Sequence, residues 1–291
     1  MKRAAIFIAV LGMCAWSFGQ SHDKPAGQNP PAGQAAPAAE QAAPAQGKRP
    51  PAAKTQPEFE AYKAAVAQTD PTAAEKAAED FASKFPDSEL RVMLFKAAMQ
   101  KYQVANNADK MKGMAEKALT YDPDDPEALV GVAQALAERT RDTDLDKDQR
   151  IAEAKKDAER ALLTIDTDVP TAGYPPEQLA AFKSFLRSEA YSILGTISFK
   201  ASNWVEAETN LRKSIDALPQ QPDTVAVFRL AVALDMQNKI PEAIKYADQA
   251  VDLTKDRPDS GVGKAARDEK DRLVKLNGGT APGQSAAPPK S

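Results

Sequence analysis

One set of apolar and small residues returns along this chain at a fixed spacing, and it constrains the fold more than any other feature. In the first copy, six positions are occupied by Tyr191, Leu194, Gly195, Ala207, Leu211 and Pro219. In the second copy, further along the chain, the first five positions are occupied by Val227, Leu230, Ala231, Ala243 and Ala247. Corresponding positions of the two copies are 36 residues apart. A period of this length predicts a stacked array in which each unit is one pair of helices.

The pattern resembles the tetratricopeptide repeat (TPR), in which W-x2-L-G-x2-Y is followed by A-x3-F and Pro over about 34 residues. The resemblance implies helical hairpins whose small residues let the two helices approach closely. The positions that carry this packing are Leu194, Gly195, Ala207, Leu230, Ala231 and Ala243. The fold implied by the resemblance is an all-α, right-handed α-solenoid of about five hairpins with a C-terminal capping helix.

The repeat domain is expected over residues 58–276. Its units are expected at residues 55–88, 92–125, 126–168, 188–221 and 224–257, and its cap at residues 262–276. Met99 and Met111 stand where the family has small residues, so the packing there is expected to be looser or adjusted. One helix is expected to run from Glu177 to Ala201, which exceeds the ordinary length of a repeat helix.

The N-terminal segment, residues 1–19, has the plan of a secretory signal peptide. A basic start is followed by an apolar run over residues 4–16, too short to span a membrane, and by small residues at Ser17 and Gly19. No later apolar run is long enough to span a membrane. Cleavage after Gly19 predicts an exported protein of the periplasm or envelope, or a secreted one. Two alternatives remain open: an uncleaved anchor, and a lipoprotein modified at Cys14, beside which Met13 is bulkier than such a signal requires.

Residues 20–57 are rich in Pro, Ala, Gln and Gly, and residues 277–291 have a similar composition. Eight of the 22 prolines fall between residues 21 and 57. Such segments bury too little apolar surface to offset chain entropy, so both are expected to be disordered. The first is interpreted as a spacer that holds the repeats away from a membrane or export site, or as a tolerated low-complexity leader.

The scarcest residues exclude several kinds of chemistry. The chain has one Cys and one His, Cys14 and His22, and both precede the expected repeat domain. That domain therefore lacks the side chains for Ser-His-Asp or Cys-His catalysis and for the usual zinc sites. A net charge of −3 without a dense basic cluster gives no indication of nucleic-acid binding. We expect no catalytic activity and no cofactor.

Five carboxylates in the third unit have the spacing of an EF-hand calcium loop. They are Asp142, Asp144, Asp146, Asp148 and Glu153. The sixth position of such a loop needs Gly for a sharp turn, but Lys147 stands there, and the flanking sequence has a helical pattern. The alternative to a calcium site is a charged, solvated extension of the hairpin. We therefore expect no bound metal and keep these carboxylates as a calcium candidate.

The resemblance also implies that the first helix of each hairpin lines a concave surface where a partner binds. The candidates for partner contact are Gln100, Gln134, Thr196, Phe199, Phe228 and Val232. The Lys, Arg and Asn positions with which some TPR domains hold a C-terminal carboxylate are not matched. The neutral, partly apolar lining predicts an extended segment or an amphipathic helix of another protein as the ligand. The alternative is that Phe199 and Phe228 pack between neighbouring repeats.

These observations predict a non-catalytic scaffold or adaptor of the cell envelope that binds an unidentified protein. An assembly or secretion helper, similar to the repeat lipoproteins of outer-membrane biogenesis, is the alternative. The stretch from Lys84 to Ser88 resembles helical junctions in that group. Incorporation of a lipid precursor at Cys14 would distinguish the two.

Overall fold

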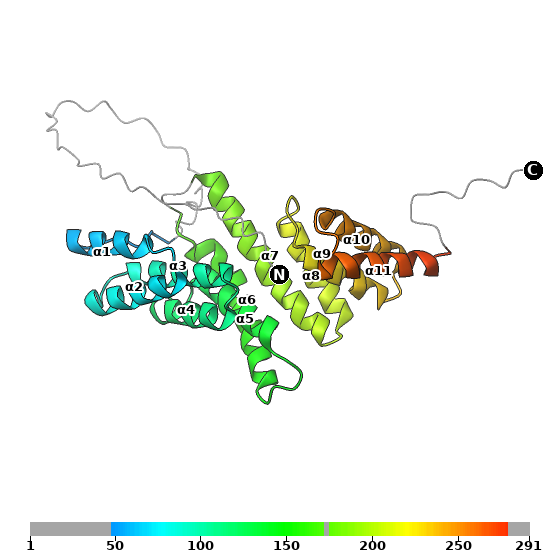
Figure 1. Ribbon diagram of the computed structural model, residues 1–291, viewed down its shortest axis with the longest axis horizontal. Coiled ribbons are helices and arrows are strands. Elements are labelled where there is room, and N and C mark those ends of the chain that lie inside the picture. Colours follow the sequence, from blue (N-terminus) through cyan, green and yellow to red (C-terminus); the bar gives the residue numbers. More distant parts are fainter. Residues whose placement is uncertain (1–47, 172–174, 279–291) are drawn as a thin grey trace, which may run out of the picture.

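The computed structural model describes residues 48–171 and 175–278, and every regular element in these ranges is an α-helix. The helices form consecutive antiparallel hairpins followed by a single final helix (Figure 1). Their bounds are α1 Gln56–Val66, α2 Pro71–Lys84, α3 Leu90–Val104, α4 Ala108–Tyr121, α5 Pro126–Arg139, α6 Lys147–Asp168, α7 Pro176–Lys200, α8 Trp204–Ala217, α9 Thr224–Asp235, α10 Ile240–Leu253 and α11 Gly261–Leu276. The expected five hairpins and capping helix are therefore confirmed.

The expected signal peptide at residues 1–19 lies outside the described residues. So do most of the expected linker and nearly all of the expected tail. The expected long helix runs from Pro176 to Lys200, one residue before the predicted start and end.

Short turns of one conformation join the two helices of three hairpins. Asn106, Ser202 and Asn238 each have a positive φ, between 56° and 59°. A left-handed residue at the end of the first helix reverses the chain in little space, and Asn tolerates it better than most residues. Asn107 and Asn203 then cap the second helices through their side-chain oxygens. Local sequence chemistry therefore sets the hairpin geometry.

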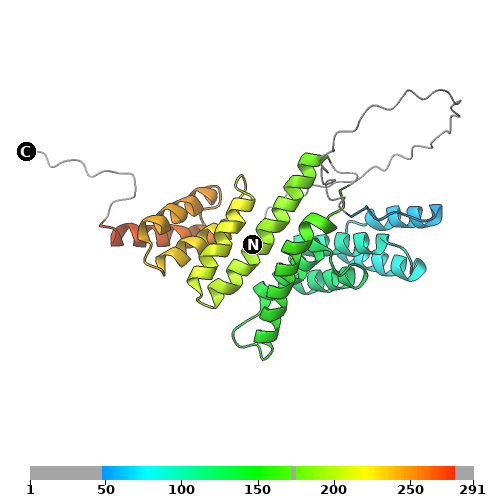
Figure 2. The ribbon, with the colours of Figure 1, turned by 180° about the vertical axis from the view of Figure 1, so that it is seen from behind.

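The hairpins stack in two layers. Helices α1, α3, α5, α7, α9 and α11 contact one another in chain order, while the second helices make no comparable contacts among themselves in the described residues. Because successive first helices lie closer to one another than successive second helices do, the stack bends toward the side of the first helices. We call this side the inner surface. Figures 1 and 2 show α7 crossing the middle of the array, with α1 to α6 on one side and α8 to α11 on the other.

Small residues bring the layers together. Ala207, Ala231 and Ala243 are fully buried, and Leu211 and Leu230 fill the space between them. A Cβ atom added to Gly195 would lie 2.7 Å from Cγ of Leu211, which is too close for two carbon atoms. Full burial of each such leucine contributes about 1.5–3 kcal/mol. The Leu-Gly and alanine positions of the repeat are thus packing positions.

Between the second and third hairpins, close packing of the helices is achieved by a different pair of residues. Met99, on α3, is buried in place of a small residue. Its Sδ lies 2.7 Å from the place that a Cβ atom would take at Gly131, on α5. The large side chain on one helix is thus matched by the missing side chain on the next. This is the adjustment that the methionine predicted, although the sequence pattern did not single out Gly131.

Helices α6 and α7 are longer than their counterparts, and their extensions pack on each other. Ile165 and Val169, from the end of α6, meet Leu186 of α7 in a separate small core. Leu179 and Phe182 complete this core from the first turns of α7. The extra length is therefore stabilised by apolar burial of its own.

An extended segment before α1 joins the second and third hairpins. We call residues 48–54 the strap. The main-chain N–H of Lys48 donates to the carbonyl oxygen of Thr167 at 3.0 Å, and its ammonium group lies 2.5 Å from Oδ2 of Asp122. Arg49 pairs with Glu89 at 2.5 Å, and Ala53 packs against the core. Residues 48–57 were expected to be disordered with the rest of the linker. The structure instead places them against the helices, because cations in the strap meet acidic loops.

Helix α11 covers the end of the stack. Ala266 and Leu273 point into the last hairpin and are fully buried. Charged side chains, among them Lys264, Asp268 and Asp271, cover its outward face. A polar outer face on the last helix is what a repeat array needs to stay in solution.

Candidate interaction surface

The six candidate contact residues all lie on the first helices of their hairpins, the helices that form the inner surface. α3 and α5 supply Gln100 and Gln134, α7 supplies Thr196 and Phe199, and α9 supplies Phe228 and Val232. The polarity and the burial of their surroundings differ from one hairpin to the next.

Between α3 and α5, charged and amide side chains pair across the hairpin boundary. Lys96 Nζ lies 2.8 Å from Oδ2 of Asp125 and 3.1 Å from Oε2 of Glu127. Burial alone lowers the pKa of Lys96, but attraction to these two carboxylates outweighs it and raises the pKa above its ordinary value. Gln100 Nε2 donates to Oε1 of Glu127 at 2.5 Å. These groups stabilise the contact between the two hairpins. Because they bond to one another, few of their hydrogen-bonding atoms remain for a ligand.

Gln134 extends the same row by one turn. It accepts a hydrogen bond from Gln103 at 3.3 Å and donates one to Glu138 at 3.3 Å. Only 6% of Gln134 is exposed. A partner on the inner surface would therefore meet little of this side chain.

Thr196 is held in a similar way between α7 and α9. Its hydroxyl donates to the carbonyl oxygen of Ser192 at 2.7 Å and accepts from Nη1 of Arg229 at 2.7 Å. The residue is 4% exposed. Phe199, one turn further along α7, packs edge-to-face on Trp204 with ring centroids 5.4 Å apart. Both residues thus contribute to contacts within the stack.

Helix α9 presents a different face. Residues at i, i+3 and i+7 along α9 and at i+11, just after its end, are all apolar and all retain exposed surface. We call these four the apolar stripe: Val225, Phe228, Val232 and Met236. Phe228 also packs partly against the small core that contains Val227, Ala250 and Ala266. Met236, which immediately follows α9, is 54% exposed.

Helices α7 and α11 flank the apolar stripe. Arg229 reaches from α9 to Thr196 on α7, and Asp235 reaches from α9 to Arg272 on α11. The stripe lies on the helix face between these two contacts. It therefore belongs to the inner surface and faces away from the core of its own hairpin.

One lysine at the end of α7 bonds to the main chain at the end of α5. Lys200, the last residue of α7, donates to the carbonyl oxygen of Ala137 at 2.6 Å and to that of Thr140 at 3.4 Å. Among the described residues, its ammonium group forms no ion pair. Burial and the nearby charge of Arg229 lower the pKa of Lys200, although the carboxylates of Glu138 and Asp142 act in the opposite direction. Lys200 therefore joins the end of α7 to the end of α5.

The structure does not bring the calcium candidates together. Nζ of Lys147 lies 2.6 Å from Oδ1 of Asp142. In Arg150, Nη1 lies 3.2 Å from Oδ2 of Asp144, and Nε lies 3.7 Å from Oδ2 of Asp146. Asp148 and Glu153 stand on α6, whose helical backbone separates them from the loop. Within residues 48–171 and 175–278, no group of three or more His, Cys, Asp or Glu side chains is placed to hold a metal ion. Cations thus pair with three of the five carboxylates, and the expected loop is partly helix.

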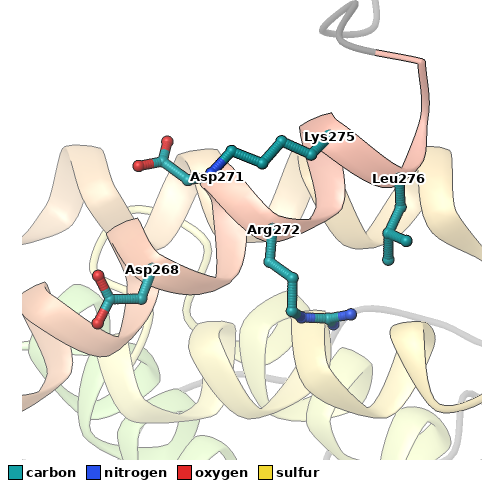
Figure 3. Close-up of a pocket in the computed structure, with 5 residues that line it drawn as sticks. All are labelled: Asp268, Asp271, Arg272, Lys275 and Leu276. Atoms are coloured by element: carbon teal, nitrogen blue, oxygen red, sulfur yellow. The ribbon is translucent and has the colours of Figure 1, made fainter.

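A shallow pocket lies along α11, lined by Asp268, Asp271, Arg272, Lys275 and Leu276 (Figure 3). All five side chains come from one helix, so no second element closes over them. We find no catalytic or binding arrangement there. In the described part of the chain, no helix is long and apolar enough to cross a membrane.

The sequence identified Phe228 and Val232 of the apolar stripe as partner contacts and Val225 as part of the concave lining, but it did not single out Met236. The register of Met236 could be predicted from the sequence, because it lies two residues before the turn residue Asn238, just as Val104 lies two residues before the turn residue Asn106.

No protein-family model matches the sequence, and no curated protein does. The chain is similar to the crystal structure of MamA protein, with 14% identity and a TM-score of 0.39 over 68% of this chain and 98% of that one. It is similar to the RpL4 assembly chaperone Acl4, with 14% identity and a TM-score of 0.39 over 76% and 97% of the two chains. The APC/C hetero-tetramer Cut9-Hcn1 gives 12% identity and a TM-score of 0.33, over 74% of this chain and 45% of that one.

These neighbours are TPR-like helical repeat proteins. At TM-scores below 0.5, the fold assignment rests on the helices of the chain itself. Paired helices, close packing at Gly195 and Ala207, and the contacts between successive first helices all agree with a repeat array. By its fold, the chain is a TPR-like α-solenoid.

Proposed function

We propose that this protein is a non-catalytic scaffold of the cell envelope that binds a segment of a partner protein on its inner surface, at the apolar stripe. The single observation that carries the proposal is the contrast between this stripe and the paired polar rows before it. Four apolar side chains on one helix face retain exposed surface between two flanking helices. Covering such a face removes apolar area from water at about 25 cal/mol per Å².

The envelope location rests on the expected signal peptide. Fractionation of cells that express the full chain tests it: the protein is expected in the periplasmic or envelope fraction, cleaved after Gly19. Recovery of the full-length chain in the cytoplasm would contradict this part of the proposal and leave the binding surface unaffected.

The binding surface is tested by one substitution and a matched control. Met236 and Val104 occupy the same register position and are 54% and 59% exposed. Met236→Asp places a charge in the stripe, whereas Val104→Asp places it at the equivalent point beside the paired polar rows. Both variants are expected to keep the unfolding midpoint of the wild type within a few degrees, because surface substitutions change stability by about 0.5 kcal/mol or less.

The readout is crosslinking of the purified variants in envelope extracts, followed by identification of the captured proteins. A specific partner is expected with the wild type and with Val104→Asp, and its recovery should fall at least about tenfold with Met236→Asp, the effect of about 1.4 kcal/mol. Equal recovery with both variants would place the binding surface elsewhere.

A further inference from the structure

The strap is held at the ends of the helices by contacts that leave it close to solvent. None of its residues is buried, and the side chain of Arg49 is 67% exposed. The carboxylates that the strap meets are less exposed, at 17% for the side chain of Asp122 and 24% for that of Asp168. The strap therefore covers acidic groups without any residue of its own being buried.

Three carboxylates beneath the strap have their cations on it. We call Glu89, Asp122 and Asp168 the acidic edge. Nζ of Lys48 lies 2.5 Å from Oδ2 of Asp122 and 3.4 Å from Oδ1 of Asp168, and Arg49 pairs with Glu89. Burial alone lowers the pKa of Lys48, but the two aspartates outweigh it and raise the pKa above its ordinary value. In the described part of the chain, these three carboxylates form no other ion pair.

Helix ends add to the negative charge of the acidic edge. Asp122 directly follows α4, and Asp168 is the last residue of α6. The C-terminal end of a helix carries partial negative charge. The neighbouring Asp124 and Asp166 differ, because they pair with arginines of α6 and α7. Without the strap, the acidic edge would keep its carboxylates but lose their paired cations, so a cationic segment placed there would be stabilised.

The strap also leaves one buried acceptor unsatisfied. Glu58 is 3% exposed, and its Oε2 accepts a hydrogen bond from the main-chain N–H of Lys54 at 2.7 Å. Its Oε1 has no hydrogen-bond partner in the described residues. A buried acceptor without a donor is destabilising. A ligand that carries one more donor than the strap would therefore interact more favourably with this surface.

Helix α1 has a cap that does not need the strap in place. The side chain of Thr55 accepts a hydrogen bond from the N–H of Glu58 at 3.3 Å, and Glu58 in turn holds the N–H of Lys54. This reciprocal arrangement is a capping box, which fixes the start of a helix locally. Residues 48–53 can therefore leave the acidic edge while α1 remains capped.

The strap indicates what kind of ligand fits. Its two cations are adjacent, and Pro50 and Pro51 follow them. Proline has no N–H group and favours an extended chain, so few main-chain donors are left without partners. One main-chain bond, from the N–H of Lys48 to the carbonyl oxygen of Thr167 at 3.0 Å, sets the register.

We propose that the acidic edge is a second docking surface, which takes an extended segment of another protein with two adjacent cations followed by proline, and that the strap is its intramolecular competitor. This surface is separate from the apolar stripe and does not depend on the proposed function. Because the strap is tethered to the repeats, its effective concentration is high, and a partner binds only where the strap has lifted.

Hydrogen exchange of the wild-type chain tests whether the strap lifts. Salt screens exposed ion pairs, so the amide of Lys48 should exchange faster as the ionic strength is raised. Amides in the middle of α5 should keep their rates, because they belong to the core of the array. A Lys48 amide that is as insensitive to salt as those of α5 would show that the strap is a fixed part of the fold, and would overturn the proposal.

Binding is tested with a fluorescent peptide of the strap sequence, residues 48–54, whose ends are acetylated and amidated to remove their charges. It is titrated by fluorescence anisotropy against the wild type and against Lys48→Glu/Arg49→Glu, in which the strap is repelled from the acidic edge. Lys48→Ala/Arg49→Ala serves in parallel, since it removes the cations without adding repulsion. The peptide should bind both variants, and the wild type at least about tenfold more weakly, because the wild-type strap competes.

Matched substitutions show where the peptide binds. Asp122→Asn/Asp168→Asn, added to either strap variant, should abolish binding. Asp252→Asn/Asp256→Asn removes two exposed carboxylates at the C-terminal end of α10 and should leave binding unchanged. Met236→Asp should also have no effect, which separates this surface from the apolar stripe.

Three binding results would overturn the proposal. Equal binding to the wild type and to the strap variants would show that the peptide uses another surface. No binding to a variant whose residue 48 amide exchanges rapidly would leave the strap a purely structural element. Dimers that form with the wild type and not with Lys48→Glu/Arg49→Glu would assign the acidic edge to the strap of a second copy and reject a different protein.

Discussion

The second and fifth hairpins use the same register but expose different chemistry on the inner surface. Counted back from the turn residues Asn106 and Asn238, Phe228 and Val232 occupy the positions that Lys96 and Gln100 hold in the second hairpin. Lys96 and Gln100 meet acidic side chains of the next hairpin. In α9 the same positions are apolar and remain partly exposed.

This difference separates two uses of one surface. Polar rows between α3 and α5 connect neighbouring repeats and satisfy themselves, so they hold the stack together. The apolar row of α9 connects to little beyond its own hairpin and remains available for another molecule. A repeat position thus has no fixed role, and its neighbours decide whether it stabilises the array or binds a partner.

The largest effect expected from breaking this contrast is on stability. Lys96→Ala leaves Asp125 and Glu127 close together without their cation, and the side chain of Lys96 is only 14% exposed. Loss of one partner from a buried pair costs about 3–5 kcal/mol, and the remaining exposure reduces this to about 2–4 kcal/mol. Lys200→Ala, whose lysine is exposed and pairs with no carboxylate, should cost less than about 1 kcal/mol. Urea unfolding of both variants measures the difference, and equal losses would remove the distinction between the two surfaces.

The next effect concerns packing in the two regions. At Gly195 an added methyl group meets the side chain and main-chain nitrogen of Leu211, whereas at Gly131 it meets the flexible end of Met99. Gly195→Ala is therefore expected to destabilise the fold by about 1–3 kcal/mol, as overpacking does. Gly131→Ala should cost less, because a methionine changes rotamer easily. Thermal unfolding of the pair checks this, and a larger loss at Gly131 would show that Met99 is held rigidly.

The stability of the fold in acid should depend on one carboxylate that bonds to each of the two hairpins: Glu75 at the second and Glu208 at the fifth. Burial alone raises the pKa of Glu75, but hydrogen bonds from Tyr102 and Lys110 lower it below its ordinary value of 4.5. Glu208 behaves alike: burial opposes the shift, and Lys239, Gln237 and Arg212 lower its pKa. A lowered pKa in the folded state stabilises the protein above about pH 4.5, and this stabilisation is lost as the pH falls through the folded value.

Glu75→Gln and Glu208→Gln should each cost about 1–2 kcal/mol at pH 7, the range for hydrogen bonds to a charged group. Each should also flatten the decline in stability between about pH 6 and pH 3. Unfolding by urea across that pH range measures both quantities. An unchanged slope for either variant would show that other carboxylates control acid unfolding.

The smallest effect is expected at a turn. Ser202 has a φ of 57°, a conformation that serine adopts less readily than the Asn of the other two turns. Ser202→Gly should therefore stabilise the protein by about 0.5 kcal/mol, and Asn106→Gly and Asn238→Gly by less. A shift in unfolding midpoint distinguishes them, and equal shifts for all three would mean that the serine turn is not strained.

Sequence reasoning predicted the hairpins and the long α7 well. Their signals are local: helical periodicity, small residues at Gly195 and Ala207, and Asn or Asp at helix starts. Each of these acts within about one hairpin, so no knowledge of distant contacts was required.

The remaining features depend on residues far apart in the chain. Gly131 compensates Met99, and the strap meets Asp122 and Glu89 across the loops. Neither partner is marked by spacing, and composition alone assigned the strap to a disordered linker. For the candidate site, periodicity identified Phe228 and Val232, but only the contacts showed that Gln134 and Thr196 are engaged within the stack.

The strap also decides where mechanical tension would enter the molecule. Lys48 is bonded to Thr167 in the third hairpin and to Asp122 in the second, before the chain reaches α1. A pull on the chain ahead of Lys48 therefore loads the interior of the array and bypasses its first helix. The load is shared by ion pairs and a main-chain hydrogen bond, which must be sheared before α1 can be peeled away. A protein anchored through its N-terminal end would in this way keep its terminal hairpin folded under strain.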